Sequence, residues 1–120
     1  MNPISSKYPA GSVVSMSFQH DDDMSTSVDG SSATLSYDMA ASSQVARRAV
    51  NMSTRMLDDS VVRLITWQVT HCGEPTPDGQ LTMSARVMQW YGWRVMIRFL
   101  VFEDARICWR GTLELEVIHD

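Results

Sequence analysis

The sequence VVRLITWQVTHCGEPTPDG, residues 61–79, sets the order of the elements on either side of it. Its first part alternates as a strand does, and one face of that strand is made of Val61, Ile65, Trp67, Val69 and His71. The two prolines and two glycines between positions 73 and 79 then exclude a continued helix or a central strand. His71 is therefore predicted to end a long strand where the chain turns, which is a suitable place for chemistry.

Three further strands are predicted after this turn. Apolar residues alternate with others over 81–90, 94–101 and 106–117, and short turns at Tyr91-Gly92 and 103–105 separate the three runs. Each run is about ten residues long, which exceeds the usual strand length. The second face of these strands is also partly apolar, so we expect a helix on one face of the sheet and a partner subunit on the other.

The chain before this stretch predicts a coil, a strand and a loop. Residues 1–12 are polar and contain two prolines, so we expect a coil lead-in. Residues 13–19 alternate and predict a first strand. The loop over 20–33 begins with the acidic run Asp21-Asp22-Asp23 and continues rich in serine, threonine and glycine.

A single long helix is predicted over residues 39–57, with Asp38 as its N-cap. No proline or glycine interrupts this segment. Its apolar face carries small residues in the first half, while Gln44, Arg48 and Asn51 fall on the polar side. Small side chains allow close approach to a neighbouring surface, so we expect this helix to lie on the sheet.

Length and composition indicate one domain, residues 1–120. A net charge of −4 and a pI near 5.2 argue against a nucleic-acid partner. No apolar run reaches the roughly 18 residues of a membrane span, and the amino terminus has no secretory pattern. Cys72 and Cys108 lie in different elements without the spacing of a zinc site, so we expect reduced thiols in a cytoplasmic protein without a metal.

The order of these elements resembles the hot-dog fold, an α+β fold in which a curved antiparallel sheet of about five strands wraps one long helix. Three motifs carry the likeness: Val69-Thr70-His71 followed by the turn at 75–79, the hairpin Gly92-Trp93-Arg94, and ICWRG at 107–111. Within the superfamily the chain is similar to acyl-CoA thioesterases of the fluoroacetyl-CoA thioesterase type. The resemblance covers roughly residues 13–118 and implies a homodimer, or a dimer of dimers, that acts on an acyl thioester of CoA or of a carrier protein without a cofactor.

The resemblance also implies site residues. The family's active-site threonine falls on Ser36, which keeps the hydroxyl, and its strand-end histidine falls on His71. Its helix glutamate falls on Gln44, whose amide has no titratable proton and cannot act as a base or nucleophile. A strand glycine of the family falls near Leu64, where a larger side chain alters the acyl pocket.

Other residues complete the expected site. We expect Tyr37, Leu64 and Thr70 to contact the substrate. Gln44 stands where the family has a carboxylate. Asp38 is one candidate to supply that carboxylate, and Asp21 and Asp23 are others. The free amides at the start of the helix would polarise the thioester carbonyl whatever the side chains.

Several functions stay open on the sequence alone. The favoured one is thioester hydrolysis between subunits, with His71 activating water. A lyase or dehydratase acting on hydroxyacyl or enoyl thioesters would need a carboxylate beside His71. Two further possibilities need neither a catalytic histidine nor a carboxylate. One is a protein that binds an acyl thioester or another hydrophobic ligand without turnover, and the other is a purely structural homodimer.

Each candidate residue also has a structural explanation. His71 would then be satisfied by backbone groups at its turn, and Ser36 and Asp38 would cap the helix. Gln44 would be solvated on the polar stripe. The four tryptophans would belong to the core or to a subunit interface.

Overall fold

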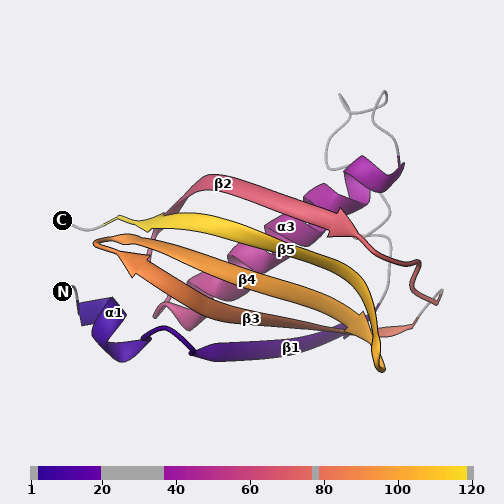
Figure 1. Cartoon of the computed structure of the whole chain (residues 1–120), viewed down its shortest axis with the longest axis horizontal. Helices are drawn as coiled ribbons and strands as arrows, with labels where there is room; N and C mark the ends of the chain where they lie inside the picture. Colours follow the sequence, from indigo (N-terminus) through magenta and orange to yellow (C-terminus); the bar gives the residue numbers. More distant parts are fainter. Residues whose placement is uncertain (1–2, 20–36, 77–78, 119–120) are drawn as a thin grey trace.

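The computed structural model describes residues 3–19, 37–76 and 79–118, with the backbone alone for Gln19 and residues 37–43. The five strands form one antiparallel sheet in the order β1-β3-β4-β5-β2. Their bounds are Val13–Gln19 for β1, Val62–His71 for β2, Gln80–Tyr91 for β3, Arg94–Glu103 for β4 and Arg106–Val117 for β5. The long helix α3, Tyr37–Met56, lies across one face of the curved sheet, behind it in the view of Figure 1. The α+β class predicted from the sequence is confirmed.

The core lies between α3 and the inner face of the sheet. On β4, and on β3 as far as Val87, every second residue is buried, as the alternation predicts: Leu81, Met83, Ala85, Val87, Val95, Ile97, Phe99 and Val101. These side chains meet the apolar stripe of α3, formed by Val45, Ala49, Met52 and Met56. Each fully buried large side chain contributes about 1.5–3 kcal/mol. No helix in the described part of the chain is long and apolar enough to cross a membrane.

The predicted phase of β2 is wrong in its first half because the strand contains a β-bulge. The register shifts between Leu64 and Thr66, so that Leu64 pairs with Leu115 and Trp67 pairs with Leu113. Paired residues share a face, so Leu64 lies with Trp67 on the core side, in place of the expected Ile65. Val61 precedes the strand and is exposed.

A second irregularity changes the end of β3, where Val87 pairs with Ile97 and Gln89 pairs with Met96, so that Met88 is the extra residue. A third irregularity changes the start of β5. The register shifts between Val101, which pairs with Trp109, and Phe102, which pairs with Ile107. Cys108 is therefore the extra residue, and it is buried beside Trp109. Ile107, which the alternation placed on the core face, is half-exposed on the outer face.

The amino-terminal segment is not the expected coil, because Pro3–Lys7 form the short helix α1. Two side chains hold this segment to the end of α3: Lys7 Nζ lies 3.0 Å from Asp58 Oδ2, and the Tyr8 hydroxyl donates to Asp58 Oδ1 at 2.6 Å. These donors lower the pKa of the Asp58 carboxyl, the hydrogen bond from Tyr8 most of all. Trp90 Nε1 also donates to the Tyr8 carbonyl at 2.8 Å.

The long helix begins and ends slightly earlier than predicted. It starts at Tyr37, so Asp38 lies inside the first turn and is not the N-cap. It ends at Met56, one residue before the predicted Leu57. Asp58 and Asp59 follow with φ of 61° and 55°, a left-handed turn that ends the helix and starts the return toward β2.

Candidate functional site

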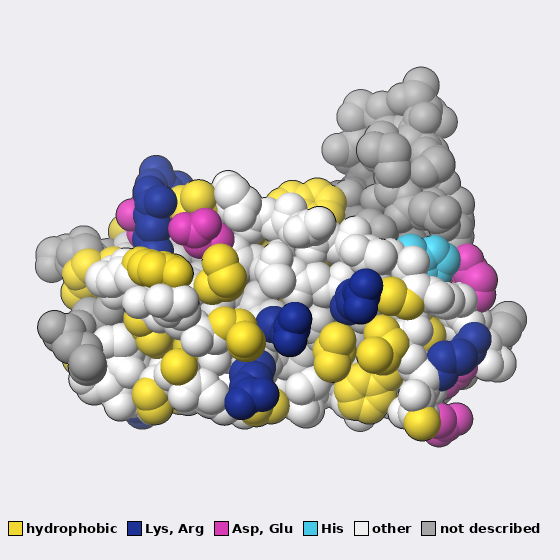
Figure 2. Space-filling model, viewed as in Figure 1, with side chains coloured by type: hydrophobic (Ala, Val, Ile, Leu, Met, Phe, Trp, Pro, Cys, Tyr) yellow, Lys and Arg dark blue, Asp and Glu magenta, His cyan; other side chains and the backbone are white. Residues whose placement is uncertain are grey.

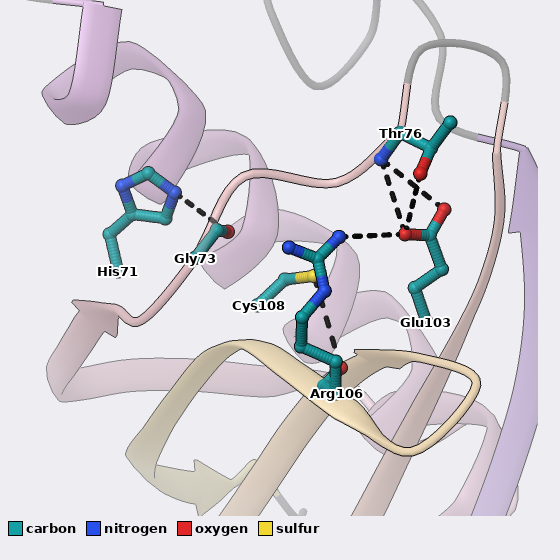
Figure 3. A network of polar contacts seen from close by, with 6 residues as sticks. All are labelled: His71, Gly73, Thr76, Glu103, Arg106 and Cys108. Atoms are coloured by element: carbon teal, nitrogen blue, oxygen red, sulfur yellow. Dashed lines mark hydrogen bonds and ion pairs between the residues drawn. The ribbon is translucent and has the colours of Figure 1, made fainter.

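His71 ends β2 on the inner face of the sheet. Its ring stacks on Trp109 of β5, the residue opposite it in the ladder, with the ring centroids 5.1 Å apart and the planes inclined by 22°. Its Nε2 lies 3.0 Å from the Gly73 carbonyl oxygen (Figure 3) and 3.5 Å from Glu74 Oε1. The side chain is 19% exposed. The imidazole is therefore held in one orientation yet keeps contact with solvent.

The Gly73 carbonyl fixes how the neutral imidazole is protonated. A carbonyl oxygen only accepts hydrogen bonds, so Nε2 carries the proton and donates it. The lone pair of the neutral ring then lies on Nδ1. If His71 acts as a base, Nδ1 is the nitrogen that takes the proton.

Glu74 is a functional candidate that the sequence reasoning missed. It brings a carboxylate to Nε2 from three residues along the chain, and its own side chain is 64% exposed. The expected carboxylates were Asp38, Asp21 and Asp23. Asp21 and Asp23 lie outside the described residues, and the structure describes only the backbone of Asp38. A Gly-containing turn directly after a strand-end histidine is the signal that could have identified Glu74.

Trp109 has a buried donor without an acceptor. The residue is 1% exposed, and its Nε1 has no hydrogen-bond partner among the residues that the structure describes. An unsatisfied buried N–H costs about 1–3 kcal/mol. Buried polar groups are nearly always paired, so this orphan donor next to the His71 ring is an unusual feature of the site.

A polar network holds the turn that follows His71. Glu103 accepts hydrogen bonds from the Thr76 backbone N–H, from the Thr76 hydroxyl at 2.9 Å and from Arg106 Nη2 at 2.8 Å (Figure 3). These donors, Arg106 first, lower the pKa of the Glu103 carboxyl. The Cys72 amide also donates to the Cys108 carbonyl at 2.7 Å. The carbonyl and carboxylate that face the imidazole therefore belong to an anchored segment.

The amino end of α3 lies at the same end of the molecule as the carboxyl end of β2 (Figure 1), where His71 is the last residue of the strand. Its first turn presents backbone N–H groups without intrahelical partners, at the positive end of the helix dipole. Ser36 lies outside the described residues, and the structure gives only the backbone of Tyr37. The expected contacts of both with a substrate stay predictions.

The other expected residues are spread over different surfaces. Gln44 is half-buried on α3 and lines a hollow on the solvent side of the helix with Arg47, Arg48 and Asn51. Leu64 and Trp67 line a groove of about 340 Å³ between β2 and α3. Thr70 pairs with Arg110 and lies on the outer face, opposite to His71, so these two side chains do not line one pocket.

The outer edge of β2 is open. The strand pairs with β5 on one side and ends the sheet on the other. Beside this edge Trp67 is 44% exposed and Leu64 is exposed as well. A long edge strand flanked by exposed apolar side chains is a surface that a second chain can cover.

Both cysteines are free thiols, and burial raises the pKa of Cys108. Cys72 is exposed. Among the residues that the structure describes, no three His, Cys, Asp or Glu side chains gather as metal ligands would. The chemistry on view is therefore that of an imidazole, a carboxylate and an indole N–H.

No protein-family model matches the sequence, and no curated protein matches it. Among solved structures, a hot-dog-like protein from Thermanaerovibrio acidaminovorans has a TM-score of 0.78 at 16% identity, covering 98% of this chain and 88% of that one. The fluoroacetyl-CoA thioesterase FlK has a TM-score of 0.72 at 18% identity, covering 92% and 87%. A thioesterase superfamily member from Thermus thermophilus has a TM-score of 0.68 at 15% identity, covering 98% and 86%. At these identities the likeness establishes the fold, and the chain has the hot-dog fold.

Proposed function

We propose that this protein hydrolyses an acyl thioester, carried by CoA or by a carrier protein, at a site completed by a second subunit. The observation that carries the proposal is the stacked pair of His71 and Trp109. The imidazole stacks on an indole whose Nε1 is buried without an acceptor in the described part of the chain. One similar structure is the fluoroacetyl-CoA thioesterase FlK and another is a thioesterase superfamily member, which supports this reaction class.

The pair offers what hydrolysis of a thioester needs. Nδ1 of His71 takes a proton from water while the water oxygen bonds to the carbonyl carbon. The resulting oxyanion accepts hydrogen bonds from the amides at the start of α3, and from Trp109 Nε1 once bound substrate displaces the side chains that bury this donor. The C–S bond then breaks, and the thiolate takes the proton back from the imidazolium. General base catalysis supplies about 10²–10⁴-fold, and one oxyanion donor about 10²–10³-fold.

Gly73 and Glu74 have a supporting role in this scheme. The Gly73 carbonyl holds Nε2–H, and Glu74 offers a negative charge to the imidazolium as it forms. Gln44 has no titratable proton, and from the solvent side of α3 its amide would contact substrate only where a second subunit completes the site. Ser36 assists with its hydroxyl.

The open edge of β2 supports the subunit arrangement. A partner that covers Leu64 and Trp67 would close the groove between β2 and α3 and remove water from it. We propose a homodimer, or a dimer of dimers, built on this edge. Free cysteines suit a reducing compartment, so the cytoplasm is the proposed location.

The experiment measures free thiol released from short, branched and aromatic acyl-CoAs by the parent protein and by His71→Gln. Glutamine keeps a hydrogen-bonding group of similar reach but has no basic nitrogen. We expect turnover by the parent and a loss of about 10²-fold or more in the variant. No thiol release from any member of the panel, or an unchanged rate for His71→Gln at unchanged folding, would overturn the proposal.

One observation favours a second candidate, a lyase or dehydratase acting on hydroxyacyl or enoyl thioesters. Such an enzyme needs a carboxylate beside its histidine, and Glu74 lies 3.5 Å from His71 Nε2. Loss of the conjugated enoyl absorbance without thiol release would identify this activity. Binding of acyl-CoA without either reaction would identify a non-catalytic binding protein, which Gln44 in place of an acid supports.

A further inference from the structure

The outer face of the sheet carries a hollow of about 410 Å³ across β2, β4 and β5. Its volume lies within the range of small-molecule sites, about 300–1,000 Å³. The polar lining consists of hydrogen-bond donors without a carboxylate: Arg98, Arg110, Thr70, Thr112 and Gln68. Figure 2 shows basic side chains across the middle of this face, with a hydrophobic cluster beside them.

Three arginines meet on this face. Arg86 of β3 pairs directly with Arg98 of β4, and Arg110 of β5 pairs with Leu100, which places Arg110 diagonal to Arg98. Directly opposite side chains have Cβ atoms about 4.5–5.5 Å apart, and diagonal neighbours are about 7–8 Å apart. All three arginines are exposed.

None of these three arginines has a carboxylate partner within the described part of the chain. Other strand arginines do: Arg63 binds Glu116, Arg94 lies 3.8 Å from Glu114, and Arg106 lies 2.8 Å from Glu103. Like charges directly opposite each other destabilise a sheet. The chain has 14 acidic and 10 basic residues, so the composition itself does not force an unpaired basic cluster.

We propose that this hollow binds the phosphate groups of an organic phosphate. The planar guanidinium groups of Arg98 and Arg110 bind phosphate oxygens in a bidentate way, with Arg86 adding charge from β3. The hydroxyls of Thr70 and Thr112 and the amide of Gln68 supply further donors. Leu100 and Ile107 form an apolar wall for the carbon skeleton that carries the phosphates.

The phosphates have two possible sources. One is the nucleotide part of a CoA thioester, and this source rests on the proposed function. Thr70 lines the hollow, and the next residue, His71, lies on the inner face at the same end of β2. The other source is a separate phosphorylated ligand that binds without passing to His71.

Calorimetric titration with adenosine 3′,5′-bisphosphate tests the binding itself. We expect the parent to bind and Arg98→Ala and Arg110→Ala each to bind about tenfold or more weakly. Arg55→Ala is the matched control, because it removes one exposed arginine from the end of α3 and should bind as the parent does. No binding by the parent, or an equal weakening in Arg55→Ala, would overturn the proposal.

Thermal unfolding of the same variants serves as the control for correct folding. Removing Arg98 relieves its repulsion with Arg86, so Tm without ligand should stay equal or rise. The bisphosphate should raise Tm of the parent and of Arg55→Ala more than that of Arg98→Ala. A ligand-induced rise of the same size in Arg98→Ala would contradict the assignment.

Hydrolysis kinetics then separate the two sources. If the hollow holds the nucleotide of CoA, Arg98→Ala should raise KM for acyl-CoA about tenfold and leave kcat and the rate with the acyl-pantetheine thioester unchanged. If bisphosphate binding falls while KM for acyl-CoA is unchanged, the ligand is a separate organic phosphate. Binding without hydrolysis of any thioester would remove the proposed function and leave this site standing. A change in subunit assembly in Arg98→Ala at unchanged bisphosphate affinity would overturn it in favour of a contact between copies of the chain.

Discussion

The two faces of the sheet use alternate residues of the same strands for opposite purposes. The inner face is buried against α3 and holds His71 and Trp109 at one end. The outer face is not covered by any described element and carries Arg86, Arg98 and Arg110, which have no carboxylate partner among the described residues. Thr70 and His71 are neighbours in the chain. Thr70 lines the hollow that contains Arg98 and Arg110, whereas His71 stacks on the buried indole of Trp109. The inner face therefore supplies stability and positions the base, while the outer face can hold charges that folding does not require.

The largest expected effect is on stability, and it compares leucines on the two faces. Leu113 is buried on the inner face, whereas Leu100 is half-buried on the outer face. Leu113→Ala should lower the free energy of unfolding by about 2–5 kcal/mol, through lost burial and a cavity. Leu100→Ala should lower it by about 1 kcal/mol or less, because its surroundings are partly solvent. Denaturant titrations of both variants check this, and equal losses would show that the outer face is covered by another chain.

The second effect separates catalysis from packing at Trp109. Trp109→Phe keeps an aromatic ring against His71 but removes Nε1. We expect kcat for thioester hydrolysis to fall by about 10²-fold, the usual effect of one oxyanion donor. The free energy of unfolding should change little, because the lost packing is offset by removal of an unsatisfied donor. A variant with unchanged kcat would show that the indole N–H has no part in the reaction.

A smaller effect is expected at Glu74. Its carboxylate is mostly exposed, and exposed ion pairs contribute about 0–1 kcal/mol. Glu74→Gln should therefore lower kcat/KM for hydrolysis by about fivefold at most. Steady-state kinetics of thiol release check this value. A loss as large as that of His71→Gln would instead show that Glu74 takes a direct part in hydrolysis.

The smallest effect concerns the pH dependence of stability at the turn after His71. Arg106 and Thr76 lower the pKa of Glu103 in the folded protein below its ordinary value of 4.5. The folded state therefore binds fewer protons here than the unfolded state. The stabilisation is complete above the unfolded value and is lost as the pH falls through the lower folded value. Glu103→Gln should flatten this part of the acid-side decline in urea midpoints, and an identical decline in the parent and the variant would contradict the assignment.

The alternation of β4, and of β3 as far as Val87, could be predicted from the sequence because both keep a two-residue period over their buried faces. β2, the end of β3 and the start of β5 could not be phased in the same way. Each contains a register shift, near Leu64, Met88 and Cys108, that leaves no mark in composition. The short helix α1 did leave a signal that the reading as coil overlooked, since Pro3 occupies a favourable first helical position.

The residues of the candidate site also differ in whether local sequence patterns identify them. His71 could be found from the sequence because it ends a strand at a proline- and glycine-rich turn. Trp109 could not, because its stacking on His71 depends on the register between β2 and β5. The cluster of Arg86, Arg98 and Arg110 also depends on register, because the pairing of β3, β4 and β5 brings together residues that are scattered along the chain. Local patterns therefore identify single residues, while cross-strand pairing determines which residues act together.

The most direct measurement is the rate of thiol release from an acyl-pantetheine thioester by the parent, His71→Gln and Arg98→Ala at equal folded concentration. This substrate lacks the nucleotide, so it reports on the inner face alone. Our account predicts turnover by the parent and an equal rate for Arg98→Ala. For His71→Gln it predicts a loss of rate of about 10²-fold or more. Equal rates for the parent and His71→Gln would contradict it, because hydrolysis would then not depend on the imidazole beside Trp109.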